Sequence, residues 1–306
     1  MLAIVCPGQG SQTPGFLNDW LHVAGVRDHL QDLSVITNRD LIAHGTESDE
    51  ETIKDTAVAQ PLIVAAGLVT ARALLGDTLP PNTVLAGHSV GEITASALAG
   101  ALSEGDAMTF VRERANAMAE AAAEQPTGMA AVLGGDPQEV LDAIEQHGLT
   151  AANANGGGQT VAAGTMEQIK ALSENPPAKA RVIPLKVAGA FHTEHMAPAV
   201  GVLKELSAKL DPADPAVPLL SNYDGKPVAD GKANLASLVA QVSRPVRWDQ
   251  CMEQLAAMGV TGILELAPAG TLVGLARRGL KGVKTLALKS PEDLEDARKF
   301  VNEHVA

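Results

Sequence analysis

The segment Gly87–Gly91 (GHSVG) restricts the fold more than any other part of the chain, because it is a G-x-S-x-G motif between a short apolar run and a helical pattern. In that setting the serine occupies a sharp strand-to-helix turn, and its hydroxyl projects clear of the sheet. Small flanking residues permit the strained backbone, and the following N–H points toward a developing oxyanion. The motif therefore predicts that Ser89 is a nucleophile. The alternative is a chance pentapeptide in a chain with 29 glycines.

Short apolar runs alternate with longer helical patterns before and after this motif. Leu2–Cys6 and Thr83–Ala86 are typical of buried strands, whereas Ala57–Leu75 and Glu104–Ala123 are typical of helices. Strands that are separated by helices indicate a parallel sheet covered on both faces. The sequence therefore predicts an α/β fold.

The middle of the chain has a different order of elements. Strand and helix patterns follow one another as βαββαβ, at residues 129–133, 137–147, 151–155, 160–163, 166–173 and 181–186. This order is typical of the ferredoxin-like split motif. We therefore expect a small ferredoxin-like subdomain over residues 127–186, inserted into a larger, discontinuous α/β domain formed by residues 1–126 and 187–306.

A serine nucleophile needs a base, and the chain has eight histidines. His88 adjoins Ser89 on the predicted turn, so its side chain should point elsewhere. His147 ends a helix, where an imidazolium suits the helix dipole. His192 lies on a loop of small residues just after the inserted segment, and it is the favoured base. His192 and His195 lack a zinc spacing and an evident third ligand, so no metal site is expected.

The segment Gly8–Gly10 (GQG) follows the first strand and imitates part of a dinucleotide-binding fingerprint. The third glycine of that fingerprint is missing, because its position is occupied by Thr13, and the chain has no G-x-x-x-x-G-K-[ST] motif. A nucleotide cofactor is therefore not expected. The same turn is able to present backbone N–H groups to an anion or an oxyanion.

Arg114 lies on the apolar face of its predicted helix, because Phe110, Arg114 and Met118 follow one another at helical spacing. A buried guanidinium without an anionic partner is very costly. The partner is either an Asp or Glu of the chain, in a structural ion pair, or the carboxylate of a substrate, held bidentately. The pattern alone favours the ion pair.

Charge and composition argue against two kinds of partner. The chain has 23 Lys and Arg against 36 Asp and Glu, a formal net charge of −13, and only 2% of its residues are aromatic. Nucleic acid is therefore not an expected partner. The longest apolar stretch, Thr56–Ala71, is interrupted by Gln60 and Pro61 and ends at Arg72. A membrane span needs about 20 apolar residues, so no membrane association is expected.

The first residues, Met1–Ser11, contain no basic region, and their apolar run ends at Pro7. This does not fit a signal peptide. Cys6 and Cys251 form neither a C-x-x-C pair nor a metal spacing, and small buried thiols in a reducing compartment are the better interpretation. We therefore expect a cytoplasmic protein.

Five segments occur in the order that is found in one enzyme family. Together they resemble the malonyl-CoA:acyl carrier protein transacylases, a family that includes the acyltransferase domains of polyketide and fatty acid synthases. The resemblance covers nearly the whole chain, and its first two motifs together are highly specific. The segments are Pro7–Gln12 (PGQGSQ), Gly87–Glu92 (GHSVGE), Arg114, Gly189–His192 (GAFH) and Pro245–Trp248 (PVRW).

The resemblance implies a hydrolase-like parallel-sheet core that carries a ferredoxin-like subdomain. It implies that Ser89 is the nucleophile and His192 its base, and that the backbone N–H groups of Gln9 and Val90 form the oxyanion hole. It also implies that Arg114 grips the malonyl carboxylate, which reverses the preference for an ion pair.

Four further residues receive roles from the resemblance. The backbone carbonyl of Gln241 orients the histidine, in place of the carboxylate of a catalytic triad. Asn155, together with Asn153, belongs to a polar segment that lines the site. Phe191 precedes the catalytic histidine and crowds the α-carbon of the acyl group, which disfavours methylmalonyl units.

The implied activity is the transfer of malonyl from malonyl-CoA to the phosphopantetheine thiol of acyl carrier protein, through a malonyl-serine intermediate in a ping-pong cycle. It supplies extender units for fatty acid synthesis, and the same chemistry serves polyketide synthesis. No cofactor or metal is needed, and the protein is expected to act as a monomer. Carrier proteins of this family are strongly acidic, so Arg181, Arg277 and Arg278 are candidates for binding the carrier or CoA. The alternative is solvated surface charge.

Two other classes of protein remain open. An esterase or lipase has the same elbow motif, but ordinary α/β-hydrolases place an acid and then a late histidine after the serine, whereas His192 lies in the middle of the chain. A buried arginine is also unusual for a site that takes a neutral ester. A non-catalytic acyl- or nucleotide-binding module does not require Ser89 and His192 together.

Overall fold

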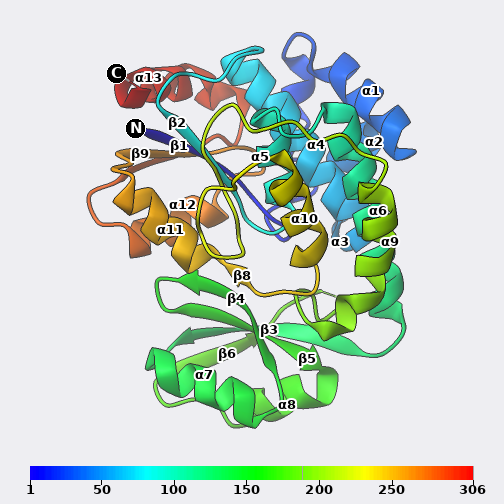
Figure 1. Ribbon diagram of the computed structural model, residues 1–306, viewed down its shortest axis with the longest axis vertical. Helices are drawn as coiled ribbons and strands as arrows, with labels where there is room; N and C mark the ends of the chain where they lie inside the picture. Colours follow the sequence, from blue (N-terminus) through cyan, green and yellow to red (C-terminus); the bar gives the residue numbers. More distant parts are fainter. Residues whose placement is uncertain (188, 306) are drawn as a thin grey trace.

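A parallel sheet forms the centre of the larger part of the molecule in the computed structural model, which describes residues 1–187 and 189–305 (Figure 1). Its strand order is β10-β9-β1-β2-β7, and every pair is parallel. The strands are β1 (Leu2–Cys6), β2 (Thr83–Gly87), β7 (Leu219–Leu220), β9 (Gly262–Glu265) and β10 (Lys284–Ala287). The predicted α/β class is confirmed.

Both faces of this sheet are covered, because alternate residues of β1 join different hydrophobic clusters. Leu2 and Ile4 pack with the N-terminal helices, whereas Ala3 and Val5 pack against α11 and α12 on the opposite face (Figure 1). The helices of this part are α1 (Val26–Thr37), α2 (Leu41–Thr46), α3 (Glu50–Lys54), α4 (Thr56–Leu75), α5 (Gly91–Leu98), α6 (Glu104–Ala123), α9 (Ala197–Ser207), α10 (Gly231–Gln241), α11 (Trp248–Ala257), α12 (Thr271–Gly279) and α13 (Leu294–Val305).

One helix corrects an expectation from the sequence. Gln60 and Pro61 do not break the helix, because α4 runs through both as a single 20-residue helix. Within the described residues α4 alone has the length and apolar composition of a membrane span, and 78% of its most apolar window is buried inside the protein. Gln60 is itself buried and hydrogen-bonded to Arg114, which accounts for a polar residue inside a core helix.

A second sheet is formed by the middle of the chain and has the strand order β6-β3-β5-β4-β8. Its first four strands and two helices follow one another as βαββαβ, and β3 pairs with β5 and β6, and β5 with β4, in antiparallel fashion. These elements are β3 (Thr127–Gly134), α7 (Pro137–Gln146), β4 (Thr150–Gly156), β5 (Gln159–Thr165), α8 (Met166–Glu174) and β6 (Ala180–Pro184). The ferredoxin-like order that the sequence predicts is confirmed.

The fifth strand of this sheet was not predicted. It is β8 (Val246–Arg247), which lies far along the chain and pairs in parallel with β4 through Asn153 and Ala154. The second sheet is therefore not built from residues 127–186 alone. One face packs on α7 and α8, and the other face contributes Met129 to the main hydrophobic cluster (Figure 1). The second sheet therefore packs against the same hydrophobic core as one face of the parallel sheet.

Glu265 ends β9 and closes the following turn. Its carboxylate is fully buried and accepts hydrogen bonds from the N–H groups of Gly270, Leu272 and Val273, at 2.9, 3.0 and 2.9 Å. Two of these donors belong to the first turn of α12, where the backbone N–H groups have no partner inside the helix. The carboxylate thus serves as the cap of α12.

We expect Glu265→Gln to lower the free energy of unfolding by about 3 kcal/mol. The amide keeps one acceptor oxygen but turns an NH2 group toward backbone donors, which leaves a buried N–H without an acceptor. Urea unfolding measures the effect, and Glu292→Gln, on the exposed surface, is the matched control. A loss as small as that of the control would mean that the carboxylate does not cap the helix.

Candidate active site

Ser89 sits at a sharp turn between β2 and α5, with a φ of 53°. A Cβ on Gly87 would clash with the backbone of Gly91, and a Cβ on Gly91 would clash with the carbonyl of Cys6. Both positions of the motif therefore need glycine, because the turn folds back on itself and presses against β1. The serine backbone is held in a left-handed conformation that few side chains adopt. This is the elbow that the motif predicts.

Asn222 fixes the backbone of the elbow from below. Its Oδ1 accepts a hydrogen bond from the Ser89 N–H at 2.7 Å, and its Nδ2 donates to the Gly87 carbonyl at 2.7 Å. The side chain is only 1% exposed. Asn222 belongs to none of the motifs of the sequence; its position two residues after a short buried strand, β7, was the available signal.

Ser89 and His192 lie in direct contact, since Oγ and Nε2 are 2.7 Å apart. The other ring nitrogen, Nδ1, lies 2.8 Å from the backbone carbonyl of Gln241. A carbonyl only accepts, so Nδ1 carries the proton and Nε2 is left to accept the proton of the serine. The His192 N–H also donates to the Val242 carbonyl at 3.0 Å, which fixes the loop to the end of α10.

The environment keeps this imidazole neutral. Burial, and after it the positive charge of Arg114, lower the pKa of His192 to about 3, against the opposing hydrogen bond to the Gln241 carbonyl. The ring is 3% exposed. Near neutral pH the imidazole is therefore in the form that takes a proton from a hydroxyl.

Arg114, on α6, directs its guanidinium toward the Ser89 hydroxyl. The guanidinium donates to Oε1 of Gln60 at 2.6 Å, to Oε1 of Gln241 at 2.7 Å, and to Oγ of Ser89 at 3.4 Å. Among the described residues no Asp or Glu oxygen lies within 4.0 Å of it, so the ion pair that the pattern alone favoured is not formed. Burial lowers the pKa of Arg114 to about 10, and the charge of Glu92 opposes this. A buried cation with neutral partners is a binding site for an anion.

A small cavity adjoins the Ser89–His192 pair. Gln9, Val90 and Phe191 line it together with Ser89 and His192, and its volume is about 80 Å³. Gln60, which accepts the hydrogen bond from Arg114, also lines it, whereas Arg114 is not among its lining residues. The backbone N–H groups of Gln9 and Val90 donate no hydrogen bond within the described part of the chain. They are thus available to an oxygen in the cavity.

Asn155 lies one layer behind this cavity. Its Oδ1 pairs with Nε2 of His88 at 2.8 Å, and its Nδ2 donates to Gln159 at 3.3 Å. The resemblance placed Asn155 on the lining, but the neighbouring Asn153 is the asparagine that lines the cavity. The pairing register of β4 shifts on both sides of Asn153, between Ala151 and Asn153 and between Ala154 and Gly156. His88 packs edge-on against Trp248, away from a catalytic role.

The basic residues proposed for the carrier protein are exposed: Arg181 lies on β6 of the second sheet, and Arg277 and Arg278 lie in the last turn of α12. Arg181 pairs in register with Leu133, which pairs on its other side with Gln159 beside the turn at residues 156–158. Two steps of about 4.8 Å put Arg181 roughly 10 Å from that turn. Arg278 packs against the same turn. The neighbouring Arg277, also exposed, donates to Thr285 at 2.9 Å.

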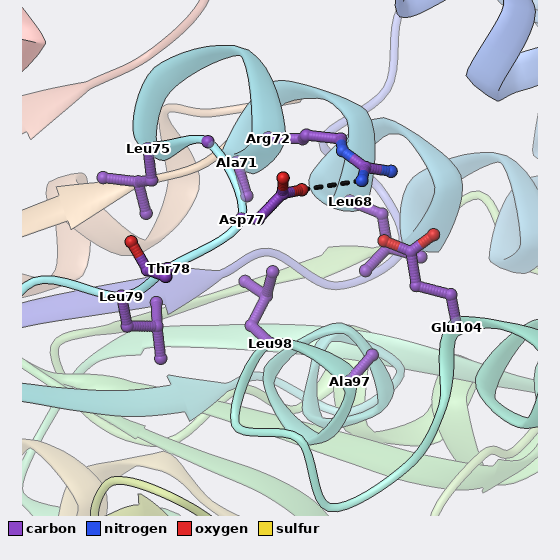
Figure 2. A pocket seen from close by; sticks show the side chains of 11 residues that line it. Leu68, Ala71, Arg72, Leu75, Asp77, Thr78, Leu79, Ala97, Leu98 and Glu104 are labelled. Atoms are coloured by element: carbon purple, nitrogen blue, oxygen red, sulfur yellow. Dashed lines mark hydrogen bonds and ion pairs between the residues drawn. The ribbon is translucent and has the colours of Figure 1, made fainter.

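A separate cavity lies between the end of α4, the following loop, and α5 and α6 (Figure 2). Leu68, Leu75 and Leu98 form its apolar wall. Its arginine, Arg72, already pairs with Asp77 at 2.6 Å, as Figure 2 shows. This cavity contains no residue of the Ser89 site and no group poised for chemistry.

Comparisons with known proteins agree with this geometry over the whole chain. The malonyl CoA-acyl carrier protein transacylase of Mycobacterium tuberculosis is 49% identical over 298 residues, which are 97% of this chain and 99% of that protein. The crystal structure of MCAT from the same organism has a TM-score of 0.94, and covers 97% of this chain and 99% of its own. A structure of PlMCAT with a type II PKS acyl-carrier protein reaches 0.92 at 29% identity, with 97% and 99% covered.

These likenesses extend through both sheets, and they confirm a hydrolase-like core with a ferredoxin-like subdomain. The family model described as the acyl transferase domain matches residues 3–301, which includes every side chain of the Ser89 site. The chain therefore belongs to the acyl transferase domain family.

Proposed function

We propose that this protein transfers malonyl from malonyl-CoA to the phosphopantetheine thiol of an acyl carrier protein, by way of a malonyl ester on Ser89. The names of its relatives support this activity. One observation carries the assignment in this chain: Arg114 is a buried cation without a carboxylate partner, and it touches the Ser89 hydroxyl. The transfer supplies extender units for fatty acid synthesis, and a carrier of polyketide synthesis is served by the same chemistry.

In the first half-reaction, Nε2 of His192 accepts the hydroxyl proton and Oγ of Ser89 attacks the thioester carbonyl. The carbonyl oxygen becomes an oxyanion, which the N–H groups of Gln9 and Val90 stabilise. The C–S bond then breaks, and the imidazolium returns the proton to the CoA thiolate. The Gln241 carbonyl stabilises the imidazolium through Nδ1–H while it carries the positive charge.

In the second half-reaction, the phosphopantetheine thiol gives its proton to His192 and attacks the malonyl ester. The same two N–H groups hold the oxyanion, and Ser89 leaves with the proton from the imidazolium. Throughout both halves Arg114 pairs with the free malonyl carboxylate. Phe191 stands beside the acyl group and leaves little room for a substituent on its α-carbon. No step calls for a metal or an organic cofactor.

We also propose a monomer in the cytoplasm that works away from membranes. Cys6 and Cys251 are both free and buried, which suits a reducing compartment. Burial raises the pKa of each thiol, so neither is a reactive thiolate. The apolar helix α4 is proposed as a core helix, because its side chains pack inside the protein.

Intact mass measurement after mixing the protein with malonyl-CoA tests the proposal. The expected result is a malonyl adduct that persists until holo acyl carrier protein is added, and then moves to the carrier. An esterase would instead release free malonate without a carrier, and a binding module would show no adduct at all. Either result would overturn the proposed function.

The two exposed arginines of α12 give a separate prediction for the carrier. The double variant Arg277→Glu, Arg278→Glu should raise the KM for acyl carrier protein on the order of 10-fold and weaken its dependence on salt. The physical reason is the loss of long-range attraction to an acidic partner. Arg27→Glu, on the exposed side of α1, reverses a charge elsewhere and serves as control. An effect of Arg27→Glu half as large in log KM, in proportion to its single reversed charge, would show that only net charge matters.

A further inference from the structure

Glu92 is a buried carboxylate that the mechanism above does not use. It is the second residue of α5, three positions after Ser89, and is 4% exposed. Oε1 accepts from the Asn222 N–H at 2.6 Å, and Oε2 accepts from Nε2 of Gln241. Burial raises the pKa of Glu92 to about 7, while these two hydrogen bonds and the charge of Arg114 hold it down. Burying a carboxylate costs free energy, so a structural or functional role is expected for Glu92.

The side chain of Gln241 joins Glu92 to Arg114. Its Nε2 donates to Glu92 and, at 3.0 Å, to the Ser89 carbonyl, while its Oε1 accepts from Arg114 at 2.7 Å. Two acceptor oxygens face the NH2 end, so turning the amide over would set oxygen against oxygen and NH2 against the guanidinium. The carboxylate, together with the Ser89 carbonyl, therefore favours the orientation in which an acceptor, not a donor, faces Arg114.

We infer that Glu92 is a positioning residue, which holds Arg114 in the orientation that binds a malonyl carboxylate and does so through the amide of Gln241. This inference rests on the proposed function. A direct ion pair between Glu92 and Arg114 would occupy the donors that the substrate needs. With a neutral amide between them, the carboxylate fixes the guanidinium and offsets its charge, and the face toward Ser89 stays available.

The same glutamine also links specificity to the base. Its backbone carbonyl holds Nδ1 of His192 at 2.8 Å, while its side chain holds Arg114. Glu92 acts on the side chain alone, because the backbone of Gln241 is set by the end of α10. Loss of the carboxylate should therefore weaken recognition of the substrate carboxylate and leave the Ser89–His192 pair in place.

Glu92→Gln is the decisive variant, because Gln has nearly the same shape but keeps only one acceptor oxygen for the two donors that face it, the Asn222 N–H and Nε2 of Gln241. Single-turnover acylation is followed by intact mass over a range of malonyl-CoA or acetyl-CoA concentrations. The malonyl-to-acetyl ratio of acylation efficiency should fall on the order of 10-fold or more. The loss should appear as weaker apparent binding of malonyl-CoA, with the acetyl-CoA values little changed.

Glu92→Asp separates positioning from space filling. Asp keeps the charge and both acceptor oxygens but changes the shape more than Gln does, so it should retain more of the ratio than Glu92→Gln. A merely structural role predicts the reverse order. Glu265→Gln removes another buried carboxylate, the cap of α12, and should leave the ratio unchanged. Thermal unfolding and circular dichroism establish that each variant is folded. If Glu92→Gln does not fold, the malonyl-to-acetyl ratio of Glu92→Asp, compared with that of the wild type, decides the test.

Outcomes for the inference and for the proposed function are distinguishable. If the wild-type protein never acquires malonyl, the proposed function fails whatever the variants do. If the wild type discriminates against acetyl-CoA and Glu92→Gln discriminates equally well, the inference is overturned. The inference is also overturned if Glu92→Gln retains more of the ratio than Glu92→Asp, or if the ratio falls equally in Glu265→Gln.

Discussion

Ser89→Ala should abolish the malonyl adduct, because no other hydroxyl contacts His192 Nε2 within the described residues. His192→Ala should keep the hydroxyl but slow its acylation about 10³- to 10⁴-fold, since the serine then has no group to accept its proton. Both rates come from intact mass measured at set times after mixing with malonyl-CoA. The two effects differ in kind: one removes the acceptor of the acyl group, and the other removes its activation.

The matched control for the base is His195→Ala. His195 lies three residues further along the same loop, but its Nδ1 pairs with Gln125 at 2.6 Å and it is not part of the cavity lining. This variant should acylate at the wild-type rate. A Ser89→Ala protein that still gains the malonyl mass would place the nucleophile on another residue. Equal loss in both histidine variants would mean that the loop, not the imidazole of His192, is what matters.

The elbow was predictable because every feature it needs is local. A short apolar strand, two glycines and a helix start lie within a few residues of Ser89, so the pentapeptide alone defines the turn. The βαββαβ order was likewise predictable, because each of its elements has its own periodicity. In contrast, β8 has two residues and is a strand only by pairing with β4, so no pattern within Val246–Arg247 reveals it.

The partners of Arg114 were beyond the sequence for a different reason. Gln60 and Gln241 are 54 and 127 residues away, and an amide oxygen leaves no signature of which distant donor it serves. The role of Gln241 was also not predictable from the residue type, because Gln241 acts on His192 through a backbone carbonyl that any residue possesses. Only the resemblance pointed to it. Of the two asparagines that the resemblance named, Asn153 lines the cavity and Asn155 pairs with His88 instead.

Arg114→Ala should change substrate choice more than any other single substitution. Malonyl and acetyl differ by one carboxylate, which an apolar slot distinguishes poorly, whereas a buried guanidinium binds the carboxylate bidentately. With acetyl the cation remains desolvated and paired only to neutral oxygens. Such a mismatch is worth about 2–5 kcal/mol, or on the order of 30- to several-thousand-fold in kcat/KM. Most of the malonyl-to-acetyl ratio should therefore disappear in the variant.

Two arginines of the same helix make the comparison sharp. Arg112 is directed away from the site, where it pairs with Glu113 and the Ile36 carbonyl, so Arg112→Ala should leave the ratio unchanged. Arg114→Lys should recover only part of the loss, because an ammonium is a point charge without the planar fork that matches a carboxylate. The measurement is kcat/KM for both acyl-CoA substrates in each variant.

The change in the rate with acetyl-CoA in Arg114→Ala tells more about the role of Arg114 than the change in the rate with malonyl-CoA does. Arg114 donates to Oγ of Ser89 at 3.4 Å, and its charge lowers the pKa of His192. Both effects weaken the nucleophile until a carboxylate pairs with the guanidinium and neutralises it. Removing Arg114 should thus release the Ser89–His192 pair, so that acetyl-CoA acylates Ser89 at least as fast as in the wild type, while acylation by malonyl-CoA slows. If both rates instead fell together at a constant ratio, Arg114 would be supporting the fold and not choosing the substrate.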